Sequence, residues 1–137
     1  MEQFINAVNT NDLDYVSRIM YFNDPLILNK KYKGKYALHY ATINAGSSIE
    51  MIELLLKLGI NINVQDDDGN TSIYYACILY TSTSSIQAIN ILLKNNPCTL
   101  IRNNEGICAY DIIKHRNINK MYHRTDDLVD LFDDFRI

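Results

Sequence analysis

The stretch DDDGNTSIYYACILY, residues 66–80, places an acidic turn directly before a long apolar run. The run shows no strand-like alternation of polar and apolar residues, which favours a buried helix. A similar phrase, KYKGKYALHYATI, occupies 31–43, and a weaker one, RNNEGICAYDIIK, occupies 102–114. One phrase repeated along the chain predicts an array of small units rather than a single irregular pattern.

The glycines of these phrases give the period. Gly69 follows Gly34 by 35 residues (69 − 34), and Gly106 follows Gly69 by 37 (106 − 69). A second apolar phrase follows in the first two units, at 49–59 and 86–96. Each predicts a helix that buries one face, because its apolar residues fall at i, i+3, i+6 and i+7: Ile49, Ile52, Leu55 and Leu56, then Ile86, Ile89, Leu92 and Leu93. Each unit is therefore a turn, a helix, a short link, a second helix and an extended segment.

In this detail the chain resembles the ankyrin-repeat family, whose period is about 33 residues with a T-P-L-H-x-A signature. GKYALHYA followed by LLLKLGININVQDDDG matches the family pattern closely, and GNTSIYYA followed by ILLKNNP is a second match. The resemblance implies an all-α ankyrin-repeat solenoid of stacked helix-turn-helix units joined by hairpin-like turns. We expect one domain, with a capping unit at 1–30, repeats at 31–65 and 66–102, and a degenerate capping repeat at 103–137.

Residues beyond the family's repeat length fall in small, polar stretches. NAGSS at 44–48 and YTSTSS at 80–85 predict lengthened links between the two helices of a unit. In the acidic turn, Asp66–Asp68 are expected to be solvated, Gly69 supplies backbone freedom, and the helix begins at Ser72.

Both ends of the chain show helical patterns. At the start, Phe4, Ala7 and Val8 share one face, and Asn11-Asp12 offers an N-cap for a second helix. At the other end, TDDLVDLFDDF at 125–135 has Thr125 as a candidate N-cap and an apolar stripe of Leu128, Leu131, Phe132 and Phe135. We interpret this segment as the helix that closes the stack. The alternative is an acidic amphipathic segment that docks in a partner's groove.

Composition narrows the function classes. The 137 residues carry a net charge of −3, which gives no electrostatic reason to expect nucleic acid or an anionic membrane as partner. The three cysteines, Cys77, Cys98 and Cys108, form no C-x-x-C pair, so they predict free thiols in a reducing compartment. The first residues show no secretory signal pattern, and the expected location is the cytoplasm, with the nucleus left open.

Candidate catalytic and metal-binding residues are few. His39 matches the histidine of T-P-L-H, which implies a structural role in the turn. Its usual threonine partner is Tyr36, while the second unit keeps Thr71 and has Tyr74 in place of histidine. His115 and His123 lack companions at zinc-ligand spacing. We expect no metal, no cofactor and no enzymatic activity.

The resemblance implies a binding surface on the concave side, formed by the turn tips and the first helix of each unit. The candidate partner-binding residues are Tyr32, Lys33, Lys35, Asn44, Asp67, Asp68, Asn70, Ile78, Leu79, Asn104, Glu105 and Ile107, with Ile43 beside them. The tips change from basic in the first unit to acidic in the later ones, which would orient a charged partner. Ile78 and Leu79 are either an exposed contact site or packed under the following link.

These features predict a monomeric, non-enzymatic module that binds a protein. The preference for Ile, Asn, Tyr and Lys resembles ankyrin proteins of poxviruses and other large DNA viruses, which implies a host protein as partner. An IκB-like inhibitor or a host-range factor is the role this analogy favours. The alternative is a self-associating assembly protein, and light scattering would separate the two.

Overall fold

The computed structural model describes residues 1–22, 25–45, 49–79 and 83–115. Within these ranges the regular structure is helical, and one isolated β-bridge joins Tyr32 to Lys35. The α-helices are α1 (Glu2–Asn9), α2 (Leu13–Phe22), α3 (Ala37–Ile43), α4 (Glu50–Lys57), α5 (Ser72–Ile78), α6 (Thr83–Lys94) and α7 (Ala109–His115); η1 (Pro25–Asn29) is a 3₁₀ helix. The predicted all-α class is confirmed.

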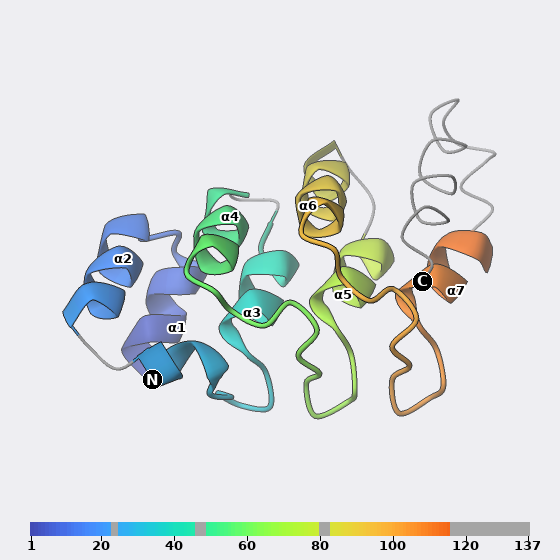
Figure 1. Cartoon of the computed structure of the whole chain (residues 1–137), viewed down its shortest axis with the longest axis horizontal. Helices are drawn as coiled ribbons and strands as arrows, with labels where there is room; N and C mark the ends of the chain where they lie inside the picture. Colours follow the sequence, from blue (N-terminus) through green and yellow to red (C-terminus); the bar gives the residue numbers. More distant parts are fainter. Residues whose placement is uncertain (23–24, 46–48, 80–82, 116–137) are drawn as a thin grey trace.

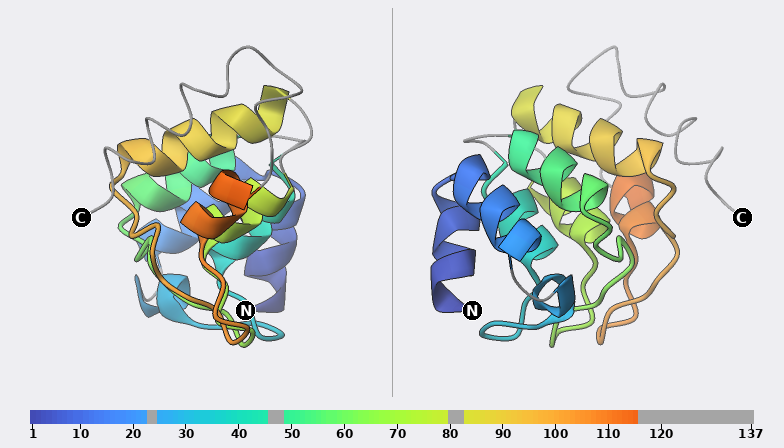
Figure 2. Two further views of the ribbon diagram at one scale, coloured as in Figure 1. Left: turned by 90° about the vertical axis from the view of Figure 1, so that its right-hand side faces the viewer. Right: turned by 60° about the vertical axis from the view of Figure 1, so that its left-hand side comes forward.

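The helices form two parallel rows (Figure 1). The inner row contains α1, α3, α5 and α7, each in contact with the next, and the outer row contains α2, α4 and α6. Figure 2 shows the same two rows from the side, with the turns that connect successive units projecting together beneath the inner row. The repeat therefore produces a layered stack, in which each unit shelters the apolar face of its neighbour.

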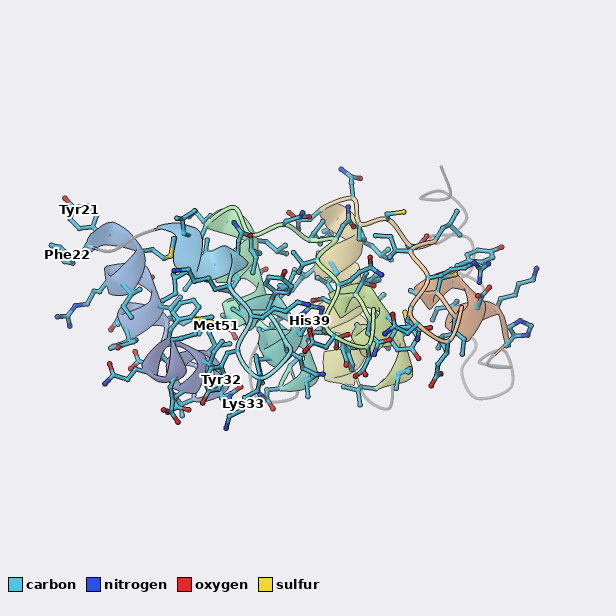
Figure 3. The ribbon with its side chains drawn as sticks, turned by 90° about the horizontal axis from the view of Figure 1, so that it is seen from below. Tyr21, Phe22, Tyr32, Lys33, His39 and Met51 are labelled. Carbon is cyan, nitrogen blue, oxygen red and sulfur yellow. The ribbon has the colours of Figure 1, made fainter. Side chains whose placement is uncertain are left out.

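The predicted apolar stripes form the core. Ile52 and Leu55 of α4, and Ile89 and Leu92 of α6, are completely buried between the rows. Burial of each such side chain contributes roughly 1.5–3 kcal/mol, so the stacking faces supply most of the favourable free energy of folding. His39 also lies in this interior, between the first and second units, as Figure 3 shows.

The first helix has the buried and exposed faces that its sequence pattern predicted. Phe4, Ala7 and Val8 of α1 are buried, whereas its polar residues Glu2, Gln3, Asn6 and Asn9 are exposed. The Asp12 carboxylate accepts a hydrogen bond from the Tyr15 N–H at 2.9 Å, which satisfies one of the free donors at the start of α2.

The links between helices differ in part from their predicted bounds. The link expected over 80–85 is shorter than predicted, because α6 already begins at Thr83. Serine and threonine are compatible with a first helical turn, where several backbone N–H groups have no intrahelical partner in any case. The closing helix predicted at 125–135 lies outside the described residues, as does most of the 44–48 link.

Ser72 at the start of α5 offers a stabilising substitution. Its side chain is completely buried, and its hydroxyl has no hydrogen-bond partner. Proline suits the first helical position, and the preceding Thr71 already has the extended conformation (φ −94°, ψ 164°) that proline requires. We expect Ser72→Pro to raise the free energy of unfolding by about 0.5–1 kcal/mol in urea denaturation. Ser17→Pro, inside α2, is the matched control and should cost about 3 kcal/mol; a loss of stability in Ser72→Pro would contradict this account.

Candidate binding surface

Three turns that each contain a glycine project from the inner row. Their glycines, Gly34, Gly69 and Gly106, have φ of +82°, +78° and +78°, values that an L side chain disfavours. Each turn closes with a backbone hydrogen bond across its neck: Tyr32 N–H to the Lys35 carbonyl at 2.8 Å, Asp66 N–H to the Asn70 carbonyl at 3.0 Å, and Asn103 N–H to the Ile107 carbonyl at 2.9 Å. The glycine period therefore predicted the turns correctly.

Successive turns are joined through their backbones. The Asp67 N–H donates to the Gly34 carbonyl at 2.9 Å, and the Asn104 N–H donates to the Asp68 carbonyl at 3.0 Å. Asn104 Nδ2 adds a bond to the Asp67 carbonyl at 3.0 Å. The tips therefore form one continuous edge, whose residues keep a fixed spacing.

A buried carboxylate holds the first two turns together. The Asp66 side chain is fully enclosed, and the prediction that it is solvated was wrong. Its Oδ1 accepts the Asn70 N–H at 2.8 Å and the Asp68 N–H at 3.0 Å, while its Oδ2 accepts the Tyr75 hydroxyl at 2.5 Å and Lys35 Nζ at 3.0 Å. A buried carboxylate is tolerated only when its lone pairs are satisfied in this way. Asp67 and Asp68 are exposed, as predicted.

His39 forms the second link between these units. Its Nδ1 accepts the Tyr36 N–H at 3.1 Å, so the neutral ring carries its proton on Nε2, which donates to the Asn70 carbonyl at 2.9 Å. In the second unit Thr71 Oγ1 accepts the Tyr74 N–H at 3.4 Å. The family motif has a threonine and a histidine in the same unit. Here the first unit keeps only the histidine and the second keeps only the threonine, and each side chain hydrogen-bonds to the backbone. His39 is structural, as its position implied.

These two groups give folding a definite pH dependence. Burial opposes ionisation of Asp66, but hydrogen bonds from Tyr75, Asn70 and Lys35 outweigh it and hold the pKa of this carboxyl below its ordinary value. Burial lowers the pKa of His39. In both cases the unfolded chain binds the proton more readily, so acid favours unfolding.

We expect stability to fall in two stages on acidification. The first begins below about pH 6.5, where unfolded histidine takes up a proton, and the second below about pH 4, where unfolded aspartate does. Urea denaturation at a series of pH values measures this. Asp66→Asn should flatten the second stage, whereas an equally steep second stage in that variant would assign it to other carboxylates.

The predicted tip residues lie together, but two of them are already engaged between turns. Lys31 Nζ pairs with Asp67 Oδ1 at 2.7 Å, and Lys35 pairs with Asp66. The exposed tip charges without a carboxylate or ammonium partner in the described part of the chain are Lys33, Asp68 and Glu105. The change from basic to acidic along the tips therefore remains, carried by fewer residues than the sequence suggested.

The other tip candidates have mainly structural contacts. Asn70 accepts a hydrogen bond from Asn103 Nδ2 at 2.9 Å, and Ile107 is half-buried against the core. Tyr32 is half-buried, with Lys33 Nζ 5.2 Å from the centre of its ring. Figure 3 shows Tyr32 and Lys33 side by side on the edge formed by the turns.

The candidates from the inner helices lie apart from the tips. Asn44 and Leu79 directly follow α3 and α5, at the helix ends remote from the turns. A seven-residue helix separates the two sets by about 10 Å. Leu79 is 40% exposed and Ile43 is 37% exposed, whereas Ile78 packs against the core. Asn44 donates to the Asn9 side chain at 2.7 Å.

Between these sets lies a row that the sequence reasoning missed. Tyr40, Tyr75 and Ile112 are each the fourth residue of an inner helix, and each is partly exposed. The Tyr40 hydroxyl donates to the Tyr32 carbonyl at 2.8 Å, so its ring leads from the helix to the tip. The available signal was positional: both tyrosines stand six residues after the turn glycine.

We call the surface made by the tips, this row and the exposed ends of the inner helices the concave face. It combines aromatic rings and aliphatic side chains with charges of both signs at the edge. Within the described residues no cluster of His, Cys, Asp or Glu could hold a metal ion. No helix in those ranges is sufficiently long and apolar to cross a membrane. Cys77 and Cys108 are buried and Cys98 is exposed.

Comparisons with known proteins agree with this architecture. The family described as ankyrin repeats (3 copies) matches residues 4–104. The chain belongs to the ankyrin-repeat family, whose members generally mediate protein–protein interaction and typically serve as non-enzymatic scaffolds.

Two sequence relatives, one viral and one bacterial, and one solved structure illustrate the similarity. The ankyrin repeat protein L86 of Acanthamoeba polyphaga mimivirus is 30% identical over 132 residues, which are 96% of this chain and 22% of the relative. An ankyrin repeat protein of Rickettsia bellii is 35% identical over 97 residues, 69% of this chain and 13% of the relative. The crystal structure of EF0377, an ankyrin repeat protein, superposes with a TM-score of 0.77 at 22% identity, covering 96% of this chain and 62% of that one. The chain thus spans about a fifth or less of the two sequence relatives, and its resemblance to L86 fits the style of a large DNA virus.

Proposed function

We propose that this chain is a non-enzymatic module that binds a segment of a partner protein along its concave face. The observation that carries the proposal is the chain of hydrogen bonds between the turns, because it holds the exposed tips at fixed spacing before any partner arrives. A preorganised surface loses little conformational entropy on binding. Tyrosine suits such a surface, since it offers a large contact area with few rotatable bonds.

The charges of the tips indicate how charge is distributed along the partner segment. Lys33 in the first turn favours an acidic group, while Asp68 and Glu105 in the later turns favour basic groups. A partner segment that runs along the edge should therefore be acidic at one end and basic at the other. The sign change fixes its direction and raises its association rate more than its final affinity.

The mimivirus relative supports a finer proposal about origin. We infer a viral protein that acts in host cytoplasm by occupying a host signalling factor, as an IκB-like inhibitor or host-range factor would. We expect this role to require no cofactor and to involve no nucleic acid or membrane. At low micromolar concentration we expect the chain to be monomeric.

Charge reversal at the tips tests the binding face. Affinity capture from an extract of candidate host cells, for example amoebae, would supply partners for titration. We expect Lys33→Glu/Asp68→Lys to weaken binding about tenfold at low salt, with less effect at high salt. Glu53→Lys/Lys57→Glu is the matched control, because it makes the same swap on the exposed side of α4 with no change in net charge. Equal loss of binding in both variants would refute the assignment to the tips.

A further inference from the structure

A second apolar surface lies at the N-terminal end of the array, away from the concave face. A pocket of about 380 Å³ opens where α1, α2 and η1 meet, and its lining includes the apolar side chains of Met1, Phe4, Tyr15, Ile19 and Ile27. This volume is within the range of about 300–1,000 Å³ that is usual for ligand pockets. Lys30 also lines the pocket.

Exposed apolar side chains stand on two of the elements that form the pocket, at the end of α2 and in η1. Tyr21, Phe22 and Leu26 are 84%, 75% and 60% exposed. Figure 3 shows Tyr21 and Phe22 projecting from the outer end of α2, away from the stack. Large apolar side chains that are this exposed near an open pocket favour a contact site. We call the pocket together with Phe22 and Leu26 the N-terminal groove.

Two positively charged side chains, Arg18 and Lys30, belong to or directly follow the elements that form the groove. Tyr15, Arg18, Ile19 and Phe22 follow one another at i, i+3, i+4 and i+7, so Arg18 lies on the α2 face that also contributes to the groove. Arg18 and Lys30 are both exposed, and neither pairs with a carboxylate in the described part of the chain. An apolar groove with two available cations suits an amphipathic segment whose polar side is acidic.

The chain itself contains a segment of this chemistry. TDDLVDLFDDF at 125–135 combines large apolar residues at helical spacing with the acids Asp126, Asp127, Asp130, Asp133 and Asp134. It follows α7, which lies at the opposite end of the array from α1 (Figure 1). A contact between this segment and the α1 end of another molecule would therefore join opposite ends of two copies.

We propose that the N-terminal groove receives the acidic segment 125–135 of a second copy of this chain, in a head-to-tail contact. Such a contact joins two different surfaces, so it propagates into chains of molecules instead of closing as a symmetric dimer. It leaves the concave face free for the partner proposed above. Because a single short segment would make the contact, we expect weak binding, with a dissociation constant on the order of 100 µM and a monomer at low micromolar concentration.

Analytical ultracentrifugation from low micromolar to several hundred micromolar tests the proposal on the full chain. We expect the average mass of the wild type to rise above 15.8 kDa with concentration. Arg18→Glu/Lys30→Glu in the groove should weaken association at least tenfold, and Asp127→Lys/Asp130→Lys in the segment should do the same. Phe22→Ser tests the apolar part of the contact on an exposed residue that folding does not require. Lys57→Glu/Lys94→Glu, on exposed positions of α4 and α6, is the control and should associate like the wild type.

Mixing the two charge variants decides the geometry. An equimolar mixture pairs each reversed groove with a reversed segment and each native groove with a native segment, so association should recover. A wild type that stays monomeric throughout would overturn the proposal, as would a mixture that fails to recover or a groove variant that associates like the wild type. All of these variants keep the tip residues, so their outcome is independent of the partner-binding test.

Discussion

Asp66→Ala is expected to lower the free energy of unfolding by about 3 kcal/mol. The substitution removes an acceptor of four hydrogen bonds that is itself fully enclosed. The Tyr75 hydroxyl and two backbone N–H groups then lose their acceptor. Leaving such donors unsatisfied costs more free energy than a single hydrogen bond contributes. Urea denaturation followed by circular dichroism measures the change.

Two neighbouring substitutions show whether burial is the cause. Asp68→Ala removes an exposed carboxylate from the same turn and should change stability by less than about 0.5 kcal/mol. Asp66→Asn keeps an oxygen for the two backbone donors but loses the charge that faces Lys35, so it should fall between the other two. Equal effects of Asp66→Ala and Asp68→Ala would show that the enclosed network does not stabilise the fold.

The second large effect is expected from Gly69→Ala, at about 3 kcal/mol of destabilisation. Gly69 has φ +78°, and an added methyl group would lie 2.9 Å from the Asn104 backbone nitrogen and 3.0 Å from the Asn103 Cα. These atoms belong to the backbone of the next turn, so relief requires the two turns to move apart. The hydrogen bond from Asn104 N–H to the Asp68 carbonyl should weaken with them.

Gly106→Ala is the matched control for this prediction. Gly106 has the same φ of +78°, but nothing lies within 4 Å of the added methyl group. The substitution should therefore cost only the conformational term, about 1 kcal/mol. If Gly69→Ala and Gly106→Ala destabilise equally, the close approach of the turns contributes nothing to stability. Faster hydrogen exchange at Asn104 in Gly69→Ala alone would locate the effect.

The fold was predictable because the sequence repeats one pattern. The spacing of Gly34, Gly69 and Gly106 predicted the turns, and the stripes around Leu55 and Leu92 predicted which helix faces are buried. Repeated stacking explains this success, since each unit meets the same environment as the next. The start of α6 was harder to predict, because serine and threonine suit both a link and a first helical turn.

The candidate site was predictable only in part. The tip residues were expected to be solvated, yet Asp66 is buried. Its carboxylate accepts hydrogen bonds from Tyr75 in α5 and from Lys35 in the preceding turn. Tyr75 and Lys35 are 9 and 31 residues from Asp66 in the sequence, so a local sequence pattern does not predict these contacts. The row of Tyr40 and Tyr75 was missed for another reason. Tyrosine is common in cores as well as on binding surfaces, and only the stacked geometry shows which side each ring takes.

Hydrogen–deuterium exchange on the complex with a captured partner would show whether the partner lies on the concave face. We expect slower exchange in the turns at 31–36, 66–71 and 103–108 and at the exposed ends of α3 and α5, with α4 and α6 unchanged. Protection confined to α4 and α6, or none in the turns, would contradict binding on the concave face.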